Sequence, residues 1–369
     1  MPSPSRERLQ HEQRLEKHLK DMPFYVVEYV RAKKRARLSP STLLGYIHDY
    51  MLFFNWLRAE GIVDCETIKD IPLEALENLK KKDVEFFIDY LTDSPFEYRK
   101  NMYKKRTHER IQRTINALKS LFNYLTTETE NDDGECYFYR NVFSKIKMSK
   151  KKESMSSRAR KISSVILSRE EIEEFLNFLR FEYEKMLSDR QQKYYLRDKE
   201  RDIAIIALAF GTGLRVSELA NITMEDVDFQ KKQIDVIRKG DKADTVLVTS
   251  WALKDLENYL AVRQERYKPS EDQRYIFLTK YQGKANPIST RTIEENVHKY
   301  TKAFNSGKAI SPHKLRHSFA SEWLRSGGNL VLLRDQLGHN SIETTSLYTN
   351  LTNEDARKVI DRMENKLEK

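Results

Sequence analysis

The chain has 369 residues, is poor in cysteine and has no long apolar stretch. Its two cysteines cannot form a disulfide framework or a zinc site on their own. The longest uninterrupted apolar run, Ile203 to Phe210, has eight residues, whereas a helix that crosses a bilayer needs about twenty. The N-terminal residues are charged rather than apolar, so no secretory signal is expected. These absences predict a cytoplasmic protein.

Positive charge is in excess, with 66 lysines and arginines against 56 acids and a formal net charge of +10. The cations are dense in Arg31–Arg37, Arg99–Arg113 and Lys145–Lys161. Such stripes are typical of proteins that bind nucleic acid, although a soluble protein that is simply basic remains the alternative. The candidates for contact with nucleic acid are Lys33, Lys34, Arg35, Lys104, Lys105, Arg106, Arg110, Arg113, Lys150, Lys151 and Lys152.

The pattern of apolar residues predicts a mainly α protein with a small β-sheet, an α+β fold of two principal domains. An N-terminal extension covers residues 1–22, and a helical domain follows at 23–128, with helices that begin after Ser39, near Asp83 and near Thr107. Residues 129–164 form a basic linker, either a strap along phosphates or a solvated tether. A second domain covers 165–352, and 353–369 form a C-terminal helix.

The second domain combines helices with a short hairpin. A capping box at Ser168 predicts a helix, and the run from Ile203 to Phe210 predicts a central, buried one. Alternating residues predict strands over 233–237 and 245–248, joined by a turn over 239–242. The segment 276–278 is expected to add a third strand, and short helices follow from Ser311.

Two segments carry cations in patterns that suit a phosphate. Arg215 lies in a glycine-flanked turn, where the neighbouring Glu218 is expected to hold it, although a helix C-cap alone explains the glycines. His313, Arg316 and His317 fall at i, i+3 and i+4 and share one helical face near a positive helix end. An exposed basic helix is the alternative. A metal site is disfavoured because the motif holds no acidic ligand.

A third segment contains a histidine and a tyrosine at the end of the predicted domain. Gly338 is the expected C-cap of a helix over 330–337, His339 follows it, and Tyr348 stands nine residues later. A lone tyrosine is more often a packing residue than a nucleophile. Its place at the end of an ordered set of cations and histidines favours the nucleophile.

That ordered set, Arg215, Lys239, His313, Arg316, His339 and Tyr348, resembles the tyrosine recombinases of the phage integrase family, and within them the Xer enzymes. Lys239 is chosen over the nearby Lys242 because it directly precedes Gly240 at the end of a strand. The resemblance covers nearly the whole chain. The segments 22–25, 137–141 and 200–206 are most similar to the single-subunit XerS type.

The resemblance implies that the protein exchanges DNA strands through a phosphotyrosine bond. Tyr348 attacks the scissile phosphate and keeps the 3′-phosphoryl end, while Arg215 and Arg316 neutralise its non-bridging oxygens. His313 takes the tyrosine proton, and Lys239 gives a proton to the leaving 5′-oxygen. The phosphotyrosine ester conserves the energy of the phosphodiester, so neither metal nor nucleotide cofactor is expected.

The remaining implied roles support this centre. His339 donates a hydrogen bond to the phosphate, and Glu218 and His317 hold the residues that contact it. The expected partner is double-stranded DNA, and the protein is expected to assemble as a homo-tetramer over two DNA sites. A DNA translocase of the cell-division machinery is the further expected partner. Chromosome dimer resolution is the expected role. The alternatives are an integrase of a mobile element, a type IB topoisomerase and a DNA-binding protein without catalysis.

Overall fold

The structure, a computed structural model, describes residues 6–148, 166–238, 242–304, 309–339, 345 and 348. The chain divides into two compact units, Ser3–Lys151 and Lys152–Lys369, and each is described by itself. No helix in the described ranges has the length and apolar character to cross a membrane. Three groups of predictions lie outside the described residues: the linker cations Lys150, Lys151 and Lys152, the catalytic Lys239, and the helix at 353–369.

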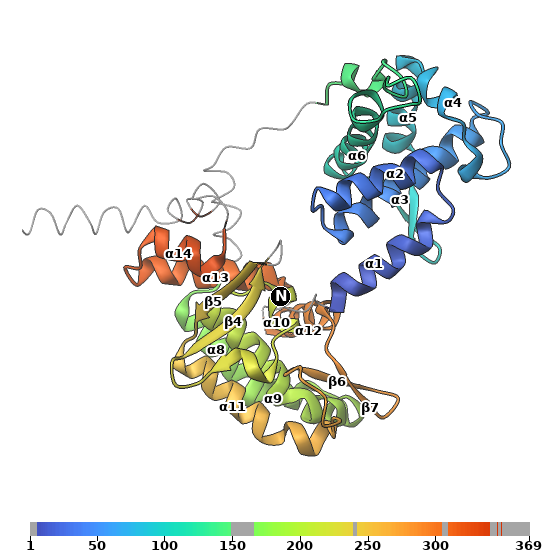
Figure 1. Ribbon diagram of the computed structural model, residues 1–369. Coiled ribbons are helices and arrows are strands. Elements are labelled where there is room, and N and C mark those ends of the chain that lie inside the picture. The colour runs from blue at the N-terminus through green and yellow to red at the C-terminus, as the bar shows by residue number, and fades with distance from the viewer. Residues whose placement is uncertain are drawn as a thin grey trace, which may run out of the picture. The chain divides into compact units, whose positions relative to one another are not determined.

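The N-terminal unit is a bundle of helices with one exposed hairpin (Figure 1). Two helices begin as the sequence predicts: Ser39 accepts a hydrogen bond from the backbone of Thr42, and Thr107 accepts one from that of Arg110. The elements are α1 (Arg6–Leu19), α2 (Phe24–Arg35), α3 (Pro40–Ala59), the 3₁₀ turn Ile68–Asp70, α4 (Leu73–Glu77), α5 (Lys81–Asp93), β1 (Phe96–Arg99), β2 (Met102–Lys104), α6 (His108–Thr127) and the 3₁₀ turn Val142–Lys145.

Aromatic side chains fill the core of this unit. The rings of Phe122 and Phe143 lie 4.7 Å apart, and the ring of Phe53 lies 5.7 Å from that of Phe143, all fully buried. These contacts join α3 and α6 to the segment that follows α6. The hairpin of β1 and β2 was not predicted, because its residues are largely exposed and lack an apolar face that alternation could reveal.

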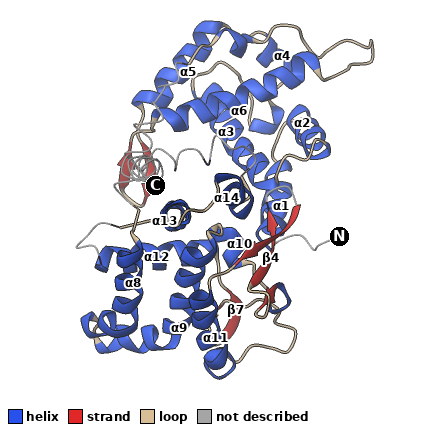
Figure 2. Ribbon diagram, turned by 90° about the vertical axis from the view of Figure 1, so that its left-hand side faces the viewer, coloured by secondary structure: helices blue, strands red, loops and turns tan. Residues whose placement is uncertain are grey.

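The C-terminal unit is built around α9 (Asp189–Thr212), which is buried over its last three turns and packs on α11 (Ser250–Tyr267) and α13 (Pro312–Arg325) (Figure 2). The predicted central helix is thus confirmed. The other elements are α8 (Arg169–Asn177), the π-helical turn Phe178–Glu182, the 3₁₀ turns Tyr183–Met186 and Met224–Asp226, α10 (Val216–Ala220), β3 (Val227–Asp228), β4 (Gln233–Arg238), β5 (Lys242–Leu247), β6 (Leu278–Tyr281), β7 (Lys284–Pro287), α12 (Thr290–Phe304) and α14 (Leu330–Leu337).

The small sheet agrees with the sequence in its hairpin and differs in its third strand. The strands β4 and β5 pair antiparallel from Gln233 opposite Leu247 to Arg238 opposite Lys242. The third strand of this sheet is β3. The segment 276–278 does not join it, and only its last residue, Leu278, lies in a strand, where it begins β6 and pairs with β7. Ile276 and Phe277 are buried, and each makes one backbone hydrogen bond outside the strands: Ile276 donates to Ile222, and Phe277 accepts from Ile288. Their apolar character reflects burial between elements rather than a place in the ladder.

The aromatic core predicts a large and local loss of stability on truncation. Phe122→Ala removes a fully buried ring, and we expect the free energy of unfolding of the N-terminal unit to fall by about 3–5 kcal/mol. Phe86→Ala is the matched control, because that ring is 52% exposed in the same unit. Denaturant unfolding of both variants measures the difference. Equal losses would contradict the proposed importance of this core.

Candidate active site

Arg215 is held at the junction of two helices. The helix α9 ends at Gly213, which has a left-handed backbone (φ 70°), and Arg215 then caps α10. A Cβ at Gly213 would lie 2.5 Å from the ring of Phe319, so only glycine fits this turn. Glu218 accepts from the backbone N–H of Arg215 and from its Nη1, both at 2.8 Å. The expected contact between these two side chains is present.

Arg316 approaches the same junction from α13. It is 1% exposed, and its Nη1 donates to the carbonyl of Gly213 at 2.7 Å, while its Nη2 donates to that of Leu337 at 2.5 Å. The Nη2 of Arg215 donates to the next carbonyl, that of Gly338, at 3.1 Å. Carbonyls at the C-terminal ends of α9 and α14 therefore hold both guanidinium groups, where the helix dipole favours cations.

This arrangement places two like charges close together. Burial, followed by the charge of Arg215, lowers the pKa of Arg316 to about 10. The Nε of Arg316 is buried and has no hydrogen-bond partner among the residues that the structure describes. A bound anion would relieve the repulsion and accept from the remaining donors. The pair suits the two non-bridging oxygens of a phosphodiester.

Arg238 is a buried support that the sequence analysis did not select. Its guanidinium donates to Glu218 Oε2 at 2.9 Å, to Asp244 Oδ2 at 2.9 Å and to the carbonyl of Gln336 at 2.7 Å. It thereby ties β4 to α14 and fixes the carboxylate that holds Arg215. The alternation of the strand could have identified Arg238 as a buried residue, since every second residue of β4 faces inward: Ile234, Val236 and Arg238.

The histidines and the tyrosine form a second cluster beside the arginines. Tyr348 is 3% exposed, and its hydroxyl lies 2.5 Å from Nδ1 of His317. The ring of His317 lies 4.5 Å from that of His313, centroid to centroid. His339 pairs through Nδ1 with the hydroxyl of Thr345 at 2.9 Å. The structure thus places His317, rather than the expected His313, on the phenol.

Burial keeps this cluster uncharged. It lowers the pKa of His317 to about 4, with the nearby charge of His313 as the next cause, and it lowers that of His339 to about 4. The pKa of His313 is lowered by burial and then by the charges of Arg316 and Arg215. Burial raises the pKa of Tyr348 to about 12. Near neutral pH, a neutral imidazole therefore faces a protonated phenol.

Within the described residues, no group of three or more histidines, cysteines or acids is arranged to hold a metal ion. The site described above is made of cations, imidazoles, one phenol and the carboxylate of Glu218, which is paired with Arg215 and Arg238.

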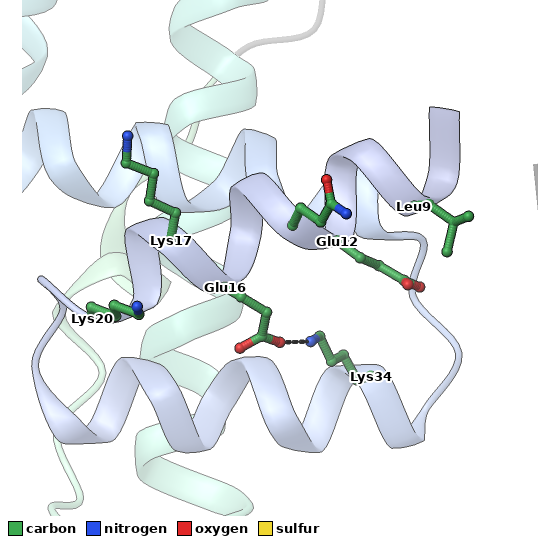
Figure 3. Close-up of a pocket in the computed structure, with 7 residues that line it drawn as sticks. Leu9, Glu12, Glu16, Lys17, Lys20 and Lys34 are labelled. Atoms are coloured by element: carbon green, nitrogen blue, oxygen red, sulfur yellow. Dashed lines mark hydrogen bonds and ion pairs between the residues drawn. The ribbon is translucent and has the colours of Figure 1, made fainter. Parts of the chain in front are cut away.

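Two of the cations predicted on α2 are already paired. Lys33 donates to both carboxylate oxygens of Glu128, and Lys34 is paired with Glu16 across a shallow hollow of about 450 Å³ (Figure 3). The hollow is lined by Leu9, Glu12, Gln13, Glu16, Lys17, Lys20 and Lys34, none of them a candidate catalytic residue. Arg35 is exposed at the end of α2.

The cations around the start of α6 lie in a different environment. Lys104 lies over the rings of Phe96 and Tyr98 on the exposed hairpin, and Lys105 is 3.8 Å from an oxygen of Asp93. Arg106 donates to the carbonyl of Ser94. Arg110 and Arg113 both face the buried Asp49 from a partly exposed position.

Comparison with known proteins identifies the family. The Phage integrase family matches residues 177–355. The chain is 40% identical over 351 residues to the tyrosine recombinase XerS of Streptococcus sanguinis and 41% identical over 354 residues to that of Streptococcus uberis, in each case covering 95% of this chain and 98% of the relative. The fold matches the XerH site-specific recombinase bound to palindromic difH substrate, with 18% identity, a TM-score of 0.60, and coverage of 90% and 82% of the two chains.

The chain belongs to the tyrosine recombinases, in their XerS group, and it is thus a DNA-breaking and rejoining enzyme of site-specific recombination. The resemblance drawn from the six ordered residues is confirmed, as is the α+β fold with a helical N-terminal region and an integrase catalytic domain. The alternatives of a topoisomerase and of a catalytically silent protein are set aside.

The lowered pKa of His317 predicts a pH dependence of stability. The folded state disfavours the protonated imidazole, whose ordinary pKa is 6.5, so its contribution is complete above that value and is lost as the pH falls towards 4. His317→Asn keeps a polar group and does not titrate. We expect its thermal midpoint to fall less steeply than that of the wild type between pH 7 and pH 4. His298→Asn, at an exposed position of α12, is the control, and identical profiles for all three proteins would contradict the assignment.

Proposed function

We propose that this recombinase cuts DNA with Tyr348 as nucleophile and resolves chromosome dimers as its biological role. The observation that carries the chemical part is the convergence of two guanidinium groups on the ends of α9 and α14, beside a phenol held by a neutral imidazole. Phosphate binding and proton transfer need these groups in one place.

In the proposed reaction, Arg215 and Arg316 bind the non-bridging oxygens of the scissile phosphate. Tyr348 loses its proton and forms a bond from its oxygen to phosphorus, while the bond from phosphorus to the 5′-oxygen breaks. The 5′-oxygen leaves as a hydroxyl with a proton from Lys239, and the 3′-phosphoryl end stays on the tyrosine. Attack by a 5′-hydroxyl of the partner strand reverses these steps and rejoins the DNA.

The histidines divide the remaining roles. His317 is assigned as the first proton acceptor of Tyr348, because its neutral Nδ1 already lies on the phenol. His313 is near enough to both arginines for their charges to lower its pKa, which supports a role as a donor to the phosphate rather than as the base. His339 is proposed as a second donor. Since Tyr348 is buried, its hydroxyl must become accessible before it can attack DNA.

The biological proposal rests on membership of the XerS group, which the chain matches over 98% of the relatives' length. We propose chromosome dimer resolution as the role, in preference to integration of a mobile element. We propose a homo-tetramer that joins two DNA sites, with a DNA translocase of the cell-division machinery as partner. Mapping the cleaved site tests this. A palindromic site near the replication terminus supports the proposal, and a junction at the end of a mobile element contradicts it.

The assignment of Tyr348 predicts separate effects on binding and cleavage. Tyr348→Phe removes only the nucleophilic oxygen, so we expect normal DNA affinity and complete loss of the covalent adduct. A nicked duplex that carries the mapped site traps the adduct for gel analysis. Tyr281→Phe, on an exposed tyrosine at the end of β6, is the control and should retain the adduct. An adduct that persists in the Tyr348 variant would disprove this mechanism.

The last segment of the chain is proposed to join protomers. Ala356, Val359, Ile360, Met363 and Leu367 recur at helical spacing and give one apolar stripe that needs a partner. We propose that this helix docks on the neighbouring subunit of the tetramer.

A chain that ends at Thr352 should therefore bind a single half-site almost normally, lose cooperative binding of the second protomer and recombine poorly. Gel-shift titration and a two-site recombination assay measure these properties. Retained cooperativity, or unfolding of the truncated protein, would place the helix on its own subunit.

A further inference from the structure

A buried carboxylate in the N-terminal unit has no part in the site described above. Asp49 lies on α3 and is 0% exposed. Its Oδ1 accepts hydrogen bonds from Arg110 Nη2 at 2.6 Å and from Thr114 Oγ1 at 3.0 Å. Its Oδ2 lies 3.9 Å from Nε of Arg113 and has no hydrogen-bond partner among the described residues. One buried acid thus faces two arginines of α6.

Both arginines extend from this acid to the surface. The side chains of Arg110 and Arg113 are 37% and 51% exposed, and they lie in the first two turns of α6, at the positive end of its dipole. Across the described ranges, neither guanidinium has an ion pair with any acid except Asp49. Their remaining N–H donors are therefore available to an anion that arrives from solvent.

The arginines of α6 are paired with a buried acid, whereas the lysines of α2 are paired with exposed ones. Lys33 and Lys34 are paired with Glu128 and Glu16, whose side chains are 41% and 61% exposed, so negative charge lies at the surface beside the positive charge. Asp49 is entirely covered. It can orient the two guanidinium groups without presenting its own charge to an approaching phosphate.

A glycine supplies an independent observation. Gly45 lies one turn before Asp49 on α3, and the guanidinium of Arg113 passes so close to it that a Cβ at this position would collide with that group. Glycine is a poor residue for a helix interior. Here its missing side chain leaves the space through which Arg113 crosses α3.

The acid is unfavourable for folding in its charged form. Burial raises the pKa of Asp49 by more than Arg110, Thr114 and Arg113 lower it. The contribution of this group to stability is therefore greatest when it is protonated at low pH, and it is lost as the pH rises through the folded pKa. A carboxylate whose ionisation costs stability at neutral pH, and whose partners face solvent, fits a role in binding better than a role in folding.

We propose, on the basis of the proposed DNA-binding function, that Asp49 is the positioning residue of a phosphate clamp in which Arg110 and Arg113 bind the DNA backbone. The buried acid fixes the direction of Arg110 through a hydrogen bond and of Arg113 through its charge. Each planar guanidinium then meets backbone phosphate oxygens with little loss of side-chain freedom. Contacts of this kind fix the register of a protein on the duplex and carry no sequence information.

The test uses full-length protein and a fluorescent duplex of mixed sequence, with affinity measured by anisotropy over a salt series. Asp49→Asn keeps the shape of the side chain and removes its charge. We expect roughly tenfold weaker binding from the loss of charge-assisted positioning, with an unchanged or higher thermal midpoint. If the carboxylate affected DNA only through its own negative charge, Asp49→Asn would instead raise the affinity, because the variant carries more net positive charge.

Two further variants separate positioning from folding. Gly45→Ala displaces Arg113 while Asp49 stays in place, so affinity should fall although alanine is the better helix former. Asp89→Asn, at an exposed position of α5, makes the same chemical change away from the clamp and should not weaken binding.

The double variant Arg110→Ala, Arg113→Ala should lower the slope of log K against log salt by about 1.8, at one phosphate contact per arginine. Asp49→Asn should add nothing in that background. Wild-type or tighter binding by Asp49→Asn or Gly45→Ala, or an undiminished effect of Asp49→Asn in the double variant, would overturn the clamp.

The outcome is independent of the proposed cleavage chemistry. Asp89→Asn, which lies away from the clamp, should still form the adduct at Tyr348, and the anisotropy comparison measures binding without any cleavage. If wild-type protein formed no adduct, the proposed mechanism would fail while the anisotropy comparison still decided the clamp.

Discussion

The catalytic unit depends on holding two guanidinium groups side by side with a single neighbouring carboxylate among the described residues, that of Glu218, which pairs with Arg215. Like charges repel, and burial of Arg316 adds a desolvation cost. Besides Glu218, the groups that offset these costs are the carbonyl oxygens of Gly213, Leu337 and Gly338, at the ends of two helices whose dipoles favour positive charge there. Both helices must therefore end at this point, and the left-handed glycines Gly213 and Gly338 are the means by which they do so.

Much of the surrounding packing follows from that constraint. The end of α14 has to stay beside the end of α9, and two polar side chains secure it. Gln336 bonds to the carbonyl of Thr212 and to both backbone groups of Leu247, and Arg238 reaches from β4 to the carbonyl of Gln336. The small sheet thus serves the site, because it supplies the buried arginine that joins Glu218 to α14. Substitution of Gln336 or Arg238 would therefore displace the carbonyls that hold the two arginines, although neither side chain is proposed to contact the phosphate.

The protein uses acids in two opposite ways to manage its excess positive charge. In the catalytic unit, the buried Glu218 binds Arg215 and Arg238 at once, and in the N-terminal unit the buried Asp49 faces Arg110 and Arg113. On α2, by contrast, exposed acids neutralise Lys33 and Lys34 at the surface. A count of cations along the sequence cannot separate these cases. A buried acid orients its cation towards a ligand, whereas an exposed acid neutralises the cation at the surface.

The sequence by itself determined the family and the fold class, and it predicted a set of site residues, because a phosphate-transfer centre needs particular residue types in a fixed order along the chain. It also determined where many helices begin and where the β4–β5 hairpin lies, since caps and alternation are local properties. Tertiary structure alone decided which side chains meet. Three contacts show this: His317 with Tyr348, Arg238 with Glu218, and Asp49 with Arg110. Each joins residues that are 20 or more positions apart in the sequence. The segment 276–278 shows the same limit: its apolar run indicates that the segment is buried, and only the packed fold decides that Leu278 pairs with β7 rather than with the β4–β5 hairpin.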